Sequence, residues 1–227
     1  MKGISRSLSL SLSLSRSRSL SVAAGLSLIF AASVSAQDSP GLSIRPFVMV
    51  TEQSFAAVDT FNAVFGKTYF PFFGGGAQVV IHDRFFAEVT ASRFRQTGQR
   101  SFLSNGKPFP LGIPLTATIT PLEVTGGYRF HIKSLPRVRP YAAGGFGSYA
   151  YQETSSFADA GEDIDTRHFG YVVNGGAEFR LHRWVGLAVD VQYSHVPGIL
   201  GTGGVSQQAG ESDLGGVAAR FKLVVGR

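Results

Sequence analysis

Residues 172–195, VVNGGAEFRLHRWVGLAVDVQYSH, contain two stretches in which apolar and polar side chains alternate. From Tyr171 to Leu181 every second residue is apolar or glycine, and the alternation resumes from Val185 to Tyr193. A period of two residues is typical of a β-strand, and so short a join predicts an antiparallel hairpin. The apolar face of this hairpin must then pack either against a protein core or against lipid.

Residues 1–36 have the organisation of an export signal. A basic segment that begins at Lys2 precedes the apolar run 20–32, which is too short to span a bilayer, and the small residues at 34–36 form a cleavage site. We therefore expect the signal to be removed and the mature chain, 37–227, to form one domain.

Composition excludes several classes of protein. The signal carries four of the 21 Lys and Arg residues and none of the 15 acidic ones, which leaves 17 basic and 15 acidic residues and a net charge of +2. This near balance gives no support for nucleic-acid binding. The absence of cysteine excludes disulfides and thiolate metal sites. The mature chain also lacks the run of about 18 apolar residues that a membrane-spanning helix requires.

The alternation recurs in eight segments along the chain. We expect strands at 42–52, 70–81, 84–94, 116–131, 139–151, 169–182, 184–194 and 213–225. Loops of about 17 to 21 residues follow the first, third, fifth and seventh strands, whereas His82-Asp83, residues 133–138 and Arg183 form short links. Alternating long and short connections predict an all-β, eight-stranded antiparallel up-and-down barrel with both chain ends at the short-turn rim.

The apolar face concentrates its aromatic residues near both rims. We predict two aromatic belts on this face, Phe85, Tyr128, Phe130, Tyr141, Phe179 and Phe221 near the short turns and Tyr149, Tyr151, Tyr171 and Tyr193 near the long loops. Small and aliphatic residues such as Ala143 and Val189 lie between the belts. Two aromatic girdles around an aliphatic band are typical of a transmembrane β-barrel, whereas a soluble sandwich or lipocalin-like barrel does not require them.

The opposite face carries balanced charges. In a transmembrane barrel these side chains line the interior, and we expect a polar network of Glu88, Glu123, Arg129, Glu178, Arg180, Asp190, Arg220 and Lys222. An eight-stranded barrel is only wide enough for its side chains to fill, and unpaired buried charges are costly. The network is therefore expected to be connected and to close the interior.

Four segments carry a resemblance to a known family: RPYAAGGFGSYAY (139–151), GGYRFHI (126–132), NGGAEFRLHRWVGLAVDVQY (174–193) and GGVAARFKLVV (215–225). The chain resembles the OmpA/OmpX-like family of small eight-stranded outer-membrane β-barrels over essentially its whole mature length. The resemblance implies the bacterial outer membrane, contact with its lipid and lipopolysaccharide, periplasmic short turns and insertion by the barrel-assembly machinery. The chain departs from the family in ending on Gly226-Arg227, with Phe221 as its last aromatic residue.

Two sets of residues suggest chemistry of their own. Ser194 and His195, close to Asp190, suggest an esterase like the lipid A deacylases, but adjacent strand residues point to opposite faces and cannot easily share a proton. The acid-rich segment 158–166 suggests either a Ca²⁺ site or a solvated loop. The carboxylates of that segment are Asp159, Glu162, Asp163 and Asp165, and the five histidines show no paired ligand spacing. We assign no catalytic residue, metal or cofactor.

Glycine-rich stretches and one loop helix complete the pattern. Four glycine pairs on the returning strands suggest bends or close backbone approaches, and nucleotide binding is disfavoured because GGGAQV (74–79) opens no helix. Residues 59–66 are expected to form a short helix, capped by Asp59 or Thr60 and ended by Gly66. That helix would be either a lid or surface anchor, or a loop that buries its own apolar groups.

These observations favour a monomeric integral outer-membrane barrel without enzymatic activity. Its expected role is structural or interactive, with loops such as 95–115 and 195–212 at the cell surface for adhesion, envelope integrity or binding of an extracellular ligand. Arg93 and Arg95 end the third strand at the height expected for lipopolysaccharide phosphates. A small porin-like channel and a lipid-modifying esterase are the alternatives.

Overall fold

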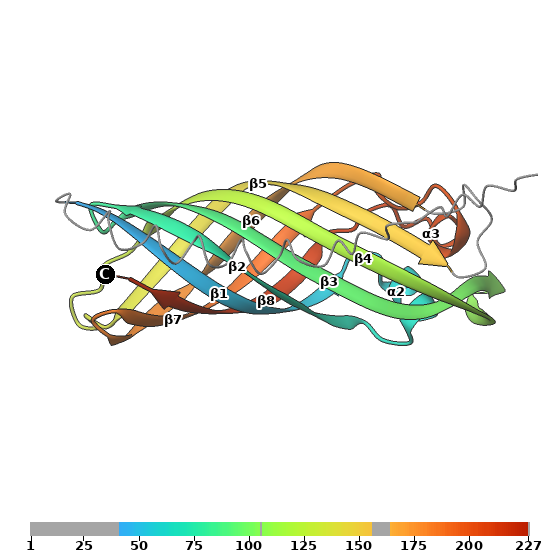
Figure 1. Cartoon of the computed structure of the whole chain (residues 1–227), viewed down its shortest axis with the longest axis horizontal. Coiled ribbons are helices and arrows are strands. Elements are labelled where there is room, and N and C mark those ends of the chain that lie inside the picture. The colour runs from blue at the N-terminus through green and yellow to red at the C-terminus, as the bar shows by residue number, and fades with distance from the viewer. Residues whose placement is uncertain (1–40, 105, 156–163, 227) are drawn as a thin grey trace, which may run out of the picture.

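The chain closes into a single eight-stranded antiparallel barrel (Figure 1). This is a computed structural model in which residues 41–104, 106–155 and 164–226 are described. The strands are β1 (Leu42–Phe55), β2 (Tyr69–Ile81), β3 (Phe85–Ser104), β4 (Lys107–Arg129), β5 (Val138–Ser155), β6 (Ile164–His182), β7 (Val185–His195) and β8 (Gly216–Val225). Two short helices, α2 (Val58–Phe65) and α3 (Gly204–Ala209), lie at the end opposite the short turns.

Each strand pairs with its neighbours in the sequence, and β8 returns to pair with β1. The closing ladder runs from Phe47 opposite Val224 to Phe55 opposite Gly216. The predicted fold class and number of strands are confirmed, because the strands close in sequence order without a crossover. Within the described residues no helix is long and apolar enough to cross a membrane.

The short connections lie at one end of the barrel, as predicted. His82 and Asp83 both have positive φ, 52° and 57°, in the link between β2 and β3. Positive φ at both central residues matches the right-handed twist of the flanking strands in a tight hairpin. The C-terminus lies at this same end (Figure 1).

The prediction of a long loop after the third strand was wrong. The strands β3 and β4, of 20 and 23 residues, stay paired as far as Ser104 opposite Lys107, so most of 95–115 is hairpin. The segment 106–114 contains proline and glycine, which are unusual inside a strand, and the ladder shifts its register between Gln99 and Ser101. From Arg95 to Ser101 both faces of β3 carry polar residues or glycine, so the hydropathy does not alternate there.

One glycine pair shows why strand interiors contain glycine here. A Cβ at Gly127 would lie 2.5 Å from both the carbonyl oxygen of Ala142 and the ring of Phe86. A Cβ at Gly126 would find its nearest neighbour at 3.9 Å. The phenylalanine ring packs edge-on against Tyr141 with 5.8 Å between centroids, so Gly127 makes room for an interior aromatic contact.

Candidate functional site

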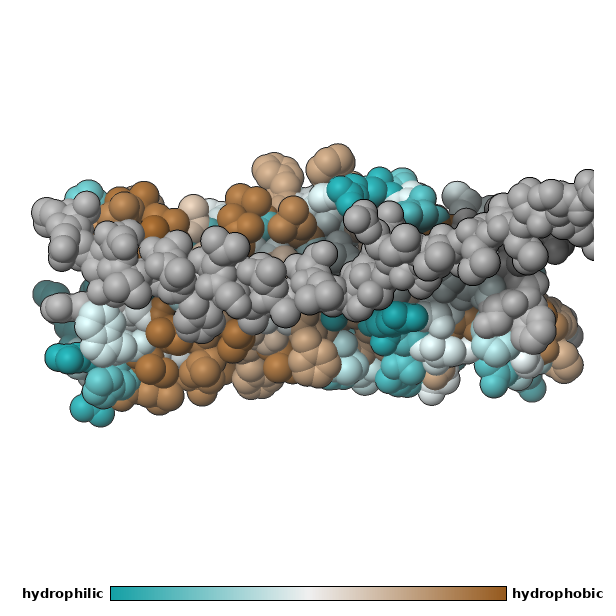
Figure 2. All heavy atoms as spheres, viewed as in Figure 1, coloured by the Kyte–Doolittle hydropathy of each residue, from teal (hydrophilic) through white to brown (hydrophobic). Residues whose placement is uncertain are grey.

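The outer surface of the barrel carries an apolar band over its short-turn half and is mixed in polarity beyond it. Figure 2 shows hydrophobic residues over most of the short-turn half, hydrophilic residues beyond them, and residues of both kinds at the end where α2 and α3 lie. On β3 the outward residues change from the exposed Phe85 and Val89 to the exposed Arg93 and Arg95. The apolar half therefore forms a band, and the rest of the barrel extends past it.

Aromatic side chains lie on the outer surface at both edges of this band. At the short-turn edge, Tyr128 packs against Phe85 and Phe130, with ring centroids 5.3 and 5.1 Å apart. At the other edge, Tyr171 and Tyr193 lie 6.4 Å apart. The predicted belt members that the structure exposes partly or fully on the outer surface are Phe85, Tyr128, Phe130, Tyr171, Phe179, Tyr193 and Phe221.

The outward orientation predicted for Tyr141, Tyr149 and Tyr151 was wrong. All three are buried, at 7%, 4% and 6% exposure, whereas Phe146 on the other face of β5 is 75% exposed. The hydroxyl of Tyr141 donates to Asp190 Oδ2 at 2.5 Å, and that of Tyr149 donates to Glu123 Oε1 at 2.7 Å. Tyrosine turns inward on this strand because interior carboxylates accept its hydroxyl hydrogen. Ala143, expected between the belts, also packs in the interior.

The interior nearest the short turns holds a three-residue ionic cluster. Glu178 on β6 accepts hydrogen bonds from Arg129 Nη2 at 2.9 Å and from Arg45 Nη1 at 2.9 Å, and Arg45 Nη2 binds its second oxygen. All three side chains are at most 5% exposed. Sequence reasoning missed Arg45, because it stands alone in the apolar segment 44–50.

A second cluster lies deeper in the barrel and centres on Asp190. Arg220 Nε donates to Asp190 Oδ1 at 2.5 Å, and Lys222 Nζ lies 3.4 Å from Asp190 Oδ2 and 2.6 Å from Glu88 Oε1. Arg220 Nη1 lies 3.8 Å from Glu123 Oε2, so Glu123 is the third carboxylate of this cluster, after Asp190 and Glu88. Charges at this burial require such partners, because the low dielectric penalises any unpaired ion.

Neutral amides connect the charged residues. Gln78 donates to Glu88 Oε2 at 3.2 Å and accepts from Arg45 Nη1 at 3.4 Å, which links the two clusters. Gln192 donates to Glu123 Oε1 at 3.0 Å and accepts from Arg220. We refer to the two clusters and these amides as the ionic network.

Arg180 does not belong to the ionic network, contrary to the prediction. Arg180 is exposed and lies near the end of β6, where the pairing with β7 shifts register between Arg180 and His182. It follows the same alternation as Glu178 but lies beyond the enclosed part of the barrel.

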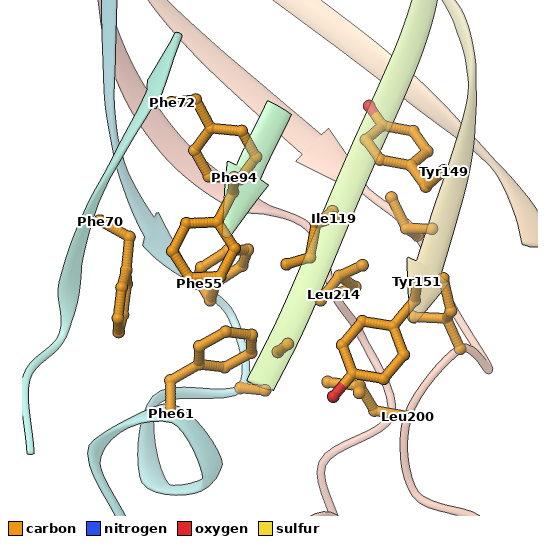
Figure 3. Close-up of a cluster of buried hydrophobic side chains, with 14 of the residues drawn as sticks. Phe55, Phe61, Phe70, Phe72, Phe94, Ile119, Tyr149, Tyr151, Leu200 and Leu214 are labelled. Atoms are coloured by element: carbon orange, nitrogen blue, oxygen red, sulfur yellow. The ribbon is translucent and has the colours of Figure 1, made fainter. Parts of the chain in front are cut away.

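Above the ionic network an aromatic cluster fills the interior (Figure 3). Phe55, Phe70, Phe72 and Phe94 come from β1, β2 and β3, and Phe61 comes from α2. The rings of Phe55 and Phe61 stack at 3.9 Å, and those of Phe72 and Phe94 stack at 5.2 Å. Sequence reasoning missed this cluster, since the run 69–73 places aromatic residues on both faces of β2.

The loop end of the barrel, which we call the mouth, is held together by cross-loop contacts. Glu211, from the segment after α3, accepts from the backbone N–H of Asp59 at 3.0 Å and of Thr60 at 2.8 Å. This carboxylate caps α2, whereas the predicted Asp59 and Thr60 side-chain caps are not formed: the cap residue is Ala57. The predicted helix itself is confirmed, and Gly66 ends it with φ 68°.

The comparisons with known proteins agree with this architecture. Residues 21–220 match the family described as "Outer membrane protein beta-barrel domain". The chain belongs to this family. It is an outer-membrane β-barrel protein, and the apolar band is its lipid-facing surface.

Several solved barrels are similar to this outer-membrane barrel. The N-terminal β-barrel domain of Pseudomonas aeruginosa OprF shares 9% identity, covering 81% of this chain and 97% of that one, with a TM-score of 0.44. Ail, the attachment invasion locus protein of Yersinia pestis, in complex with the heparin analogue sucrose octasulfate, shares 13% identity over 82% and 97%, with a TM-score of 0.45. Neisserial surface protein A shares 12% identity over 82% and 96%, also with a TM-score of 0.45. No curated protein matches the chain at a significant level.

The residues considered for catalysis in this outer-membrane barrel are separated. Ser194 is buried in the interior, while His195 is partly exposed and pairs with Asp213 through Nδ1 and Oδ2 at 2.6 Å. Asp213 also accepts from the backbone N–H of Val196 and of Gly215, so it organises the turn of the loop. The serine and the histidine face different sides of β7, as their adjacency predicts.

The acid-rich segment falls mostly outside the described residues. Asp159, Glu162 and Asp163 lie in the interval 156–163, whereas Asp165 belongs to β6 and accepts from Gln152 Nε2 at 3.1 Å. Within the part of the chain that is described, no three His, Asp or Glu side chains converge as metal ligands.

Proposed function

We propose that this barrel is a closed outer-membrane anchor that presents its mouth and the β3–β4 hairpin at the cell surface for binding or for envelope integrity. The proposal includes export by residues 1–36, insertion of 37–227 by the barrel-assembly machinery and a monomeric state. It includes neither catalysis nor a cofactor.

The length of the β3–β4 hairpin carries the proposal. A tilted strand crosses a bilayer in about 9–11 residues, so strands of 20 and 23 residues project well past the lipid. Its exposed residues include the polar Thr97 and Gln99 and, nearer the tip, the apolar Phe102, Phe109 and Leu111. A paired ribbon outside the membrane that exposes both polar and apolar side chains is a surface on which a partner can bind without disturbing the lipid-embedded part of the barrel.

Two arginines lie where the apolar band ends. Arg93 pairs across the ladder with Phe73, which is 64% exposed, and Arg95 follows on the same outward face. Cations at this height meet lipopolysaccharide phosphates, and guanidinium groups bind phosphate in bidentate geometry. We expect Arg93→Gln with Arg95→Gln to purify with less lipopolysaccharide, measured as phosphate per barrel, than Arg183→Gln at the opposite rim.

A closed interior distinguishes this proposal from the channel alternative. The ionic network and the aromatic cluster are stacked along the barrel, and the largest side chains that are below 2% exposed include Arg220, Phe70, Phe72 and Phe94. Ions crossing the barrel would have to displace both layers.

The experiment shortens the β3–β4 hairpin while keeping the pairing of the remaining residues unchanged. Thr97 pairs with Thr116, so residues 98–115 are replaced by Asn-Gly, which favours a two-residue turn. A deletion strain is complemented with the wild-type or the trimmed barrel, and surface attachment and detergent resistance are scored. Both proteins must first shift on heating in detergent gels, which shows that each barrel is folded.

The outcomes separate the roles. If the hairpin presents a binding surface, the trimmed barrel restores detergent resistance but not attachment. If it serves envelope integrity, neither property is restored in full. A trimmed barrel that matches the wild type in both assays would overturn the proposal.

A further inference from the structure

A cavity of about 570 Å³ opens in the mouth, above the aromatic cluster. Its walls come from α2, from the β3–β4 hairpin, from β5 and β6, and from the segment that contains α3. Sites for small molecules typically measure about 300–1,000 Å³ and are lined mainly by apolar and aromatic side chains with a few polar groups. The size of this cavity lies within that range.

The lining is chiefly apolar. Phe61 and Phe65 of α2, Leu115 of β4, Tyr151 of β5 and Leu200 of the last loop contribute to it. The charged residues of the lining are Arg100 and Glu153, one of each sign, and Glu153 already accepts from the Tyr151 hydroxyl at 2.8 Å. Such a lining favours an uncharged ligand, because an ion would lose its hydration without a dedicated partner.

The walls are fixed before any ligand arrives. Ser101 Oγ donates to the carbonyl oxygen of Ala63 at 2.8 Å, which ties the hairpin to α2, and Gln208 of α3 accepts from the backbone N–H of Leu103 at 2.7 Å. Together with the Glu211 cap, these contacts hold three loop segments in place. Preformed walls reduce the entropy lost on binding.

The cavity has a closed floor. Phe61, Tyr151 and Leu200 belong both to its lining and to the aromatic cluster beneath it, and in Figure 3 the Tyr151 hydroxyl points toward the end where α2 lies. The ionic network lies below that cluster. A molecule that enters from outside the cell therefore meets a packed aromatic floor and does not pass into the periplasm.

We propose that the mouth is a binding site for an uncharged, mainly apolar small molecule with an aromatic ring, which the barrel captures from outside without transporting it. This goes beyond the proposed function, which names no ligand for the mouth and whose two roles, attachment and envelope integrity, do not require the cavity. Phe65, which is partly exposed, provides the aromatic surface against which a planar ligand stacks, and the buried Phe61 and Tyr151 lie in the floor.

Benzophenone serves as the probe, because it is uncharged and aromatic and inserts into nearby C–H bonds on irradiation. The barrel in lipid nanodiscs is irradiated at increasing benzophenone concentration, and labelled peptides are quantified by mass spectrometry. We expect saturable labelling of segments 61–65, 111–115 and 199–206. Labelling of the lipid-facing strands should increase without saturation, since it reports partition into the bilayer.

Two variants fill the cavity and one serves as a matched control. Gly203 lines the cavity, has extended backbone with φ −174°, and an added Cβ there meets no atom within 4 Å. Leu111 also lines the cavity and is 48% exposed. We therefore expect the barrel to fold with either Gly203→Trp or Leu111→Trp. Gln207→Trp places the same ring on α3 outside the lining.

Filling the cavity should weaken the saturable labelling by about tenfold or more, as overpacking a formed site does, whereas Gln207→Trp should leave it unchanged. All variants must retain the heat-induced shift of a folded barrel. Labelling confined to the lipid-facing strands, or equal mouth labelling in Gly203→Trp, Leu111→Trp and wild type, would overturn the site. Neither result bears on the hairpin experiment, so the two proposals fail separately.

Discussion

Arg45 on β1 and Glu178 on β6 form a buried ion pair across the barrel, although their strands do not pair with each other and the residues lie 133 positions apart. Arg129 on β4 binds the same carboxylate. One glutamate therefore connects three strands through the interior. Such cross-barrel contacts add to the backbone ladder and favour the closed barrel over an open sheet.

Glu178→Ala should destabilise the barrel more than Arg45→Ala. Removing the carboxylate leaves two buried arginines without their shared partner, which costs about 3–5 kcal/mol. Removing Arg45 leaves Glu178 bound to Arg129, and the cost should be about 1–3 kcal/mol. Urea unfolding from lipid vesicles measures both free energies, and equal values for the two variants would contradict this account of the cluster.

Tyr141→Phe tests the orientation of β5. The change keeps the ring but removes the hydrogen bond to Asp190, so we expect a loss of about 1.5–3 kcal/mol in the free energy of unfolding. Tyr128→Phe on the outer surface is the control and should change it by less than about 0.5 kcal/mol. If the two variants were equally stable, Tyr141 would not be interior.

Gly127→Ala and Gly126→Ala form a matched pair on adjacent residues. The first places a methyl group 2.5 Å from the Phe86 ring and should cost about 1–3 kcal/mol, because the surrounding atoms must move. The second finds its nearest atom at 3.9 Å and should change stability by about 0.5 kcal/mol at most. The same unfolding assay compares them, and a reversed order would show that close packing does not explain the glycine.

Glu211→Ala should loosen the mouth without destabilising the barrel. Loss of the carboxylate leaves the amides of Asp59 and Thr60 without their cap, at a cost of about 1 kcal/mol to α2. Hydrogen exchange should become faster in α2 and stay unchanged in β7 and β8. Glu52→Ala, which removes an exposed charge from β1, should have no effect on α2 exchange.

Much of the strand order and orientation could be predicted from the sequence, because each strand in the short-turn half has lipid on one face and the polar interior on the other. Lipid outside and a polar interior impose alternation on each strand, which located β6 and β7 within a few residues. The same alternation placed Glu88, Asp190 and Lys222 on the face that the structure buries. The short links at His82-Asp83, at residues 133–138 and at Arg183 were also predictable, because few residues separate the alternating segments there.

The errors occur where the two faces do not differ in polarity. On β5 tyrosine, alanine and glycine occupy one face and alanine, glycine and phenylalanine the other, so hydropathy alone could not orient the strand. Beyond the apolar band, β3 carries polar residues or glycine on both faces from Arg95 to Ser101, so the alternation in hydropathy disappears there although the pairing with β4 continues. Arg45 was missed since pairing across the barrel depends on the register of closure, which a single strand does not encode.

Conductance in planar bilayers tests the central claim most directly, namely that the ionic network and the aromatic cluster close this outer-membrane barrel. The sample is first shown to be folded by its heat-induced gel shift, and its insertion is verified by protease protection in the same lipid. The account predicts no ion current from the wild-type protein at moderate voltage. Stable, stepwise conductance from wild-type barrels would contradict it and would establish the protein as a small channel.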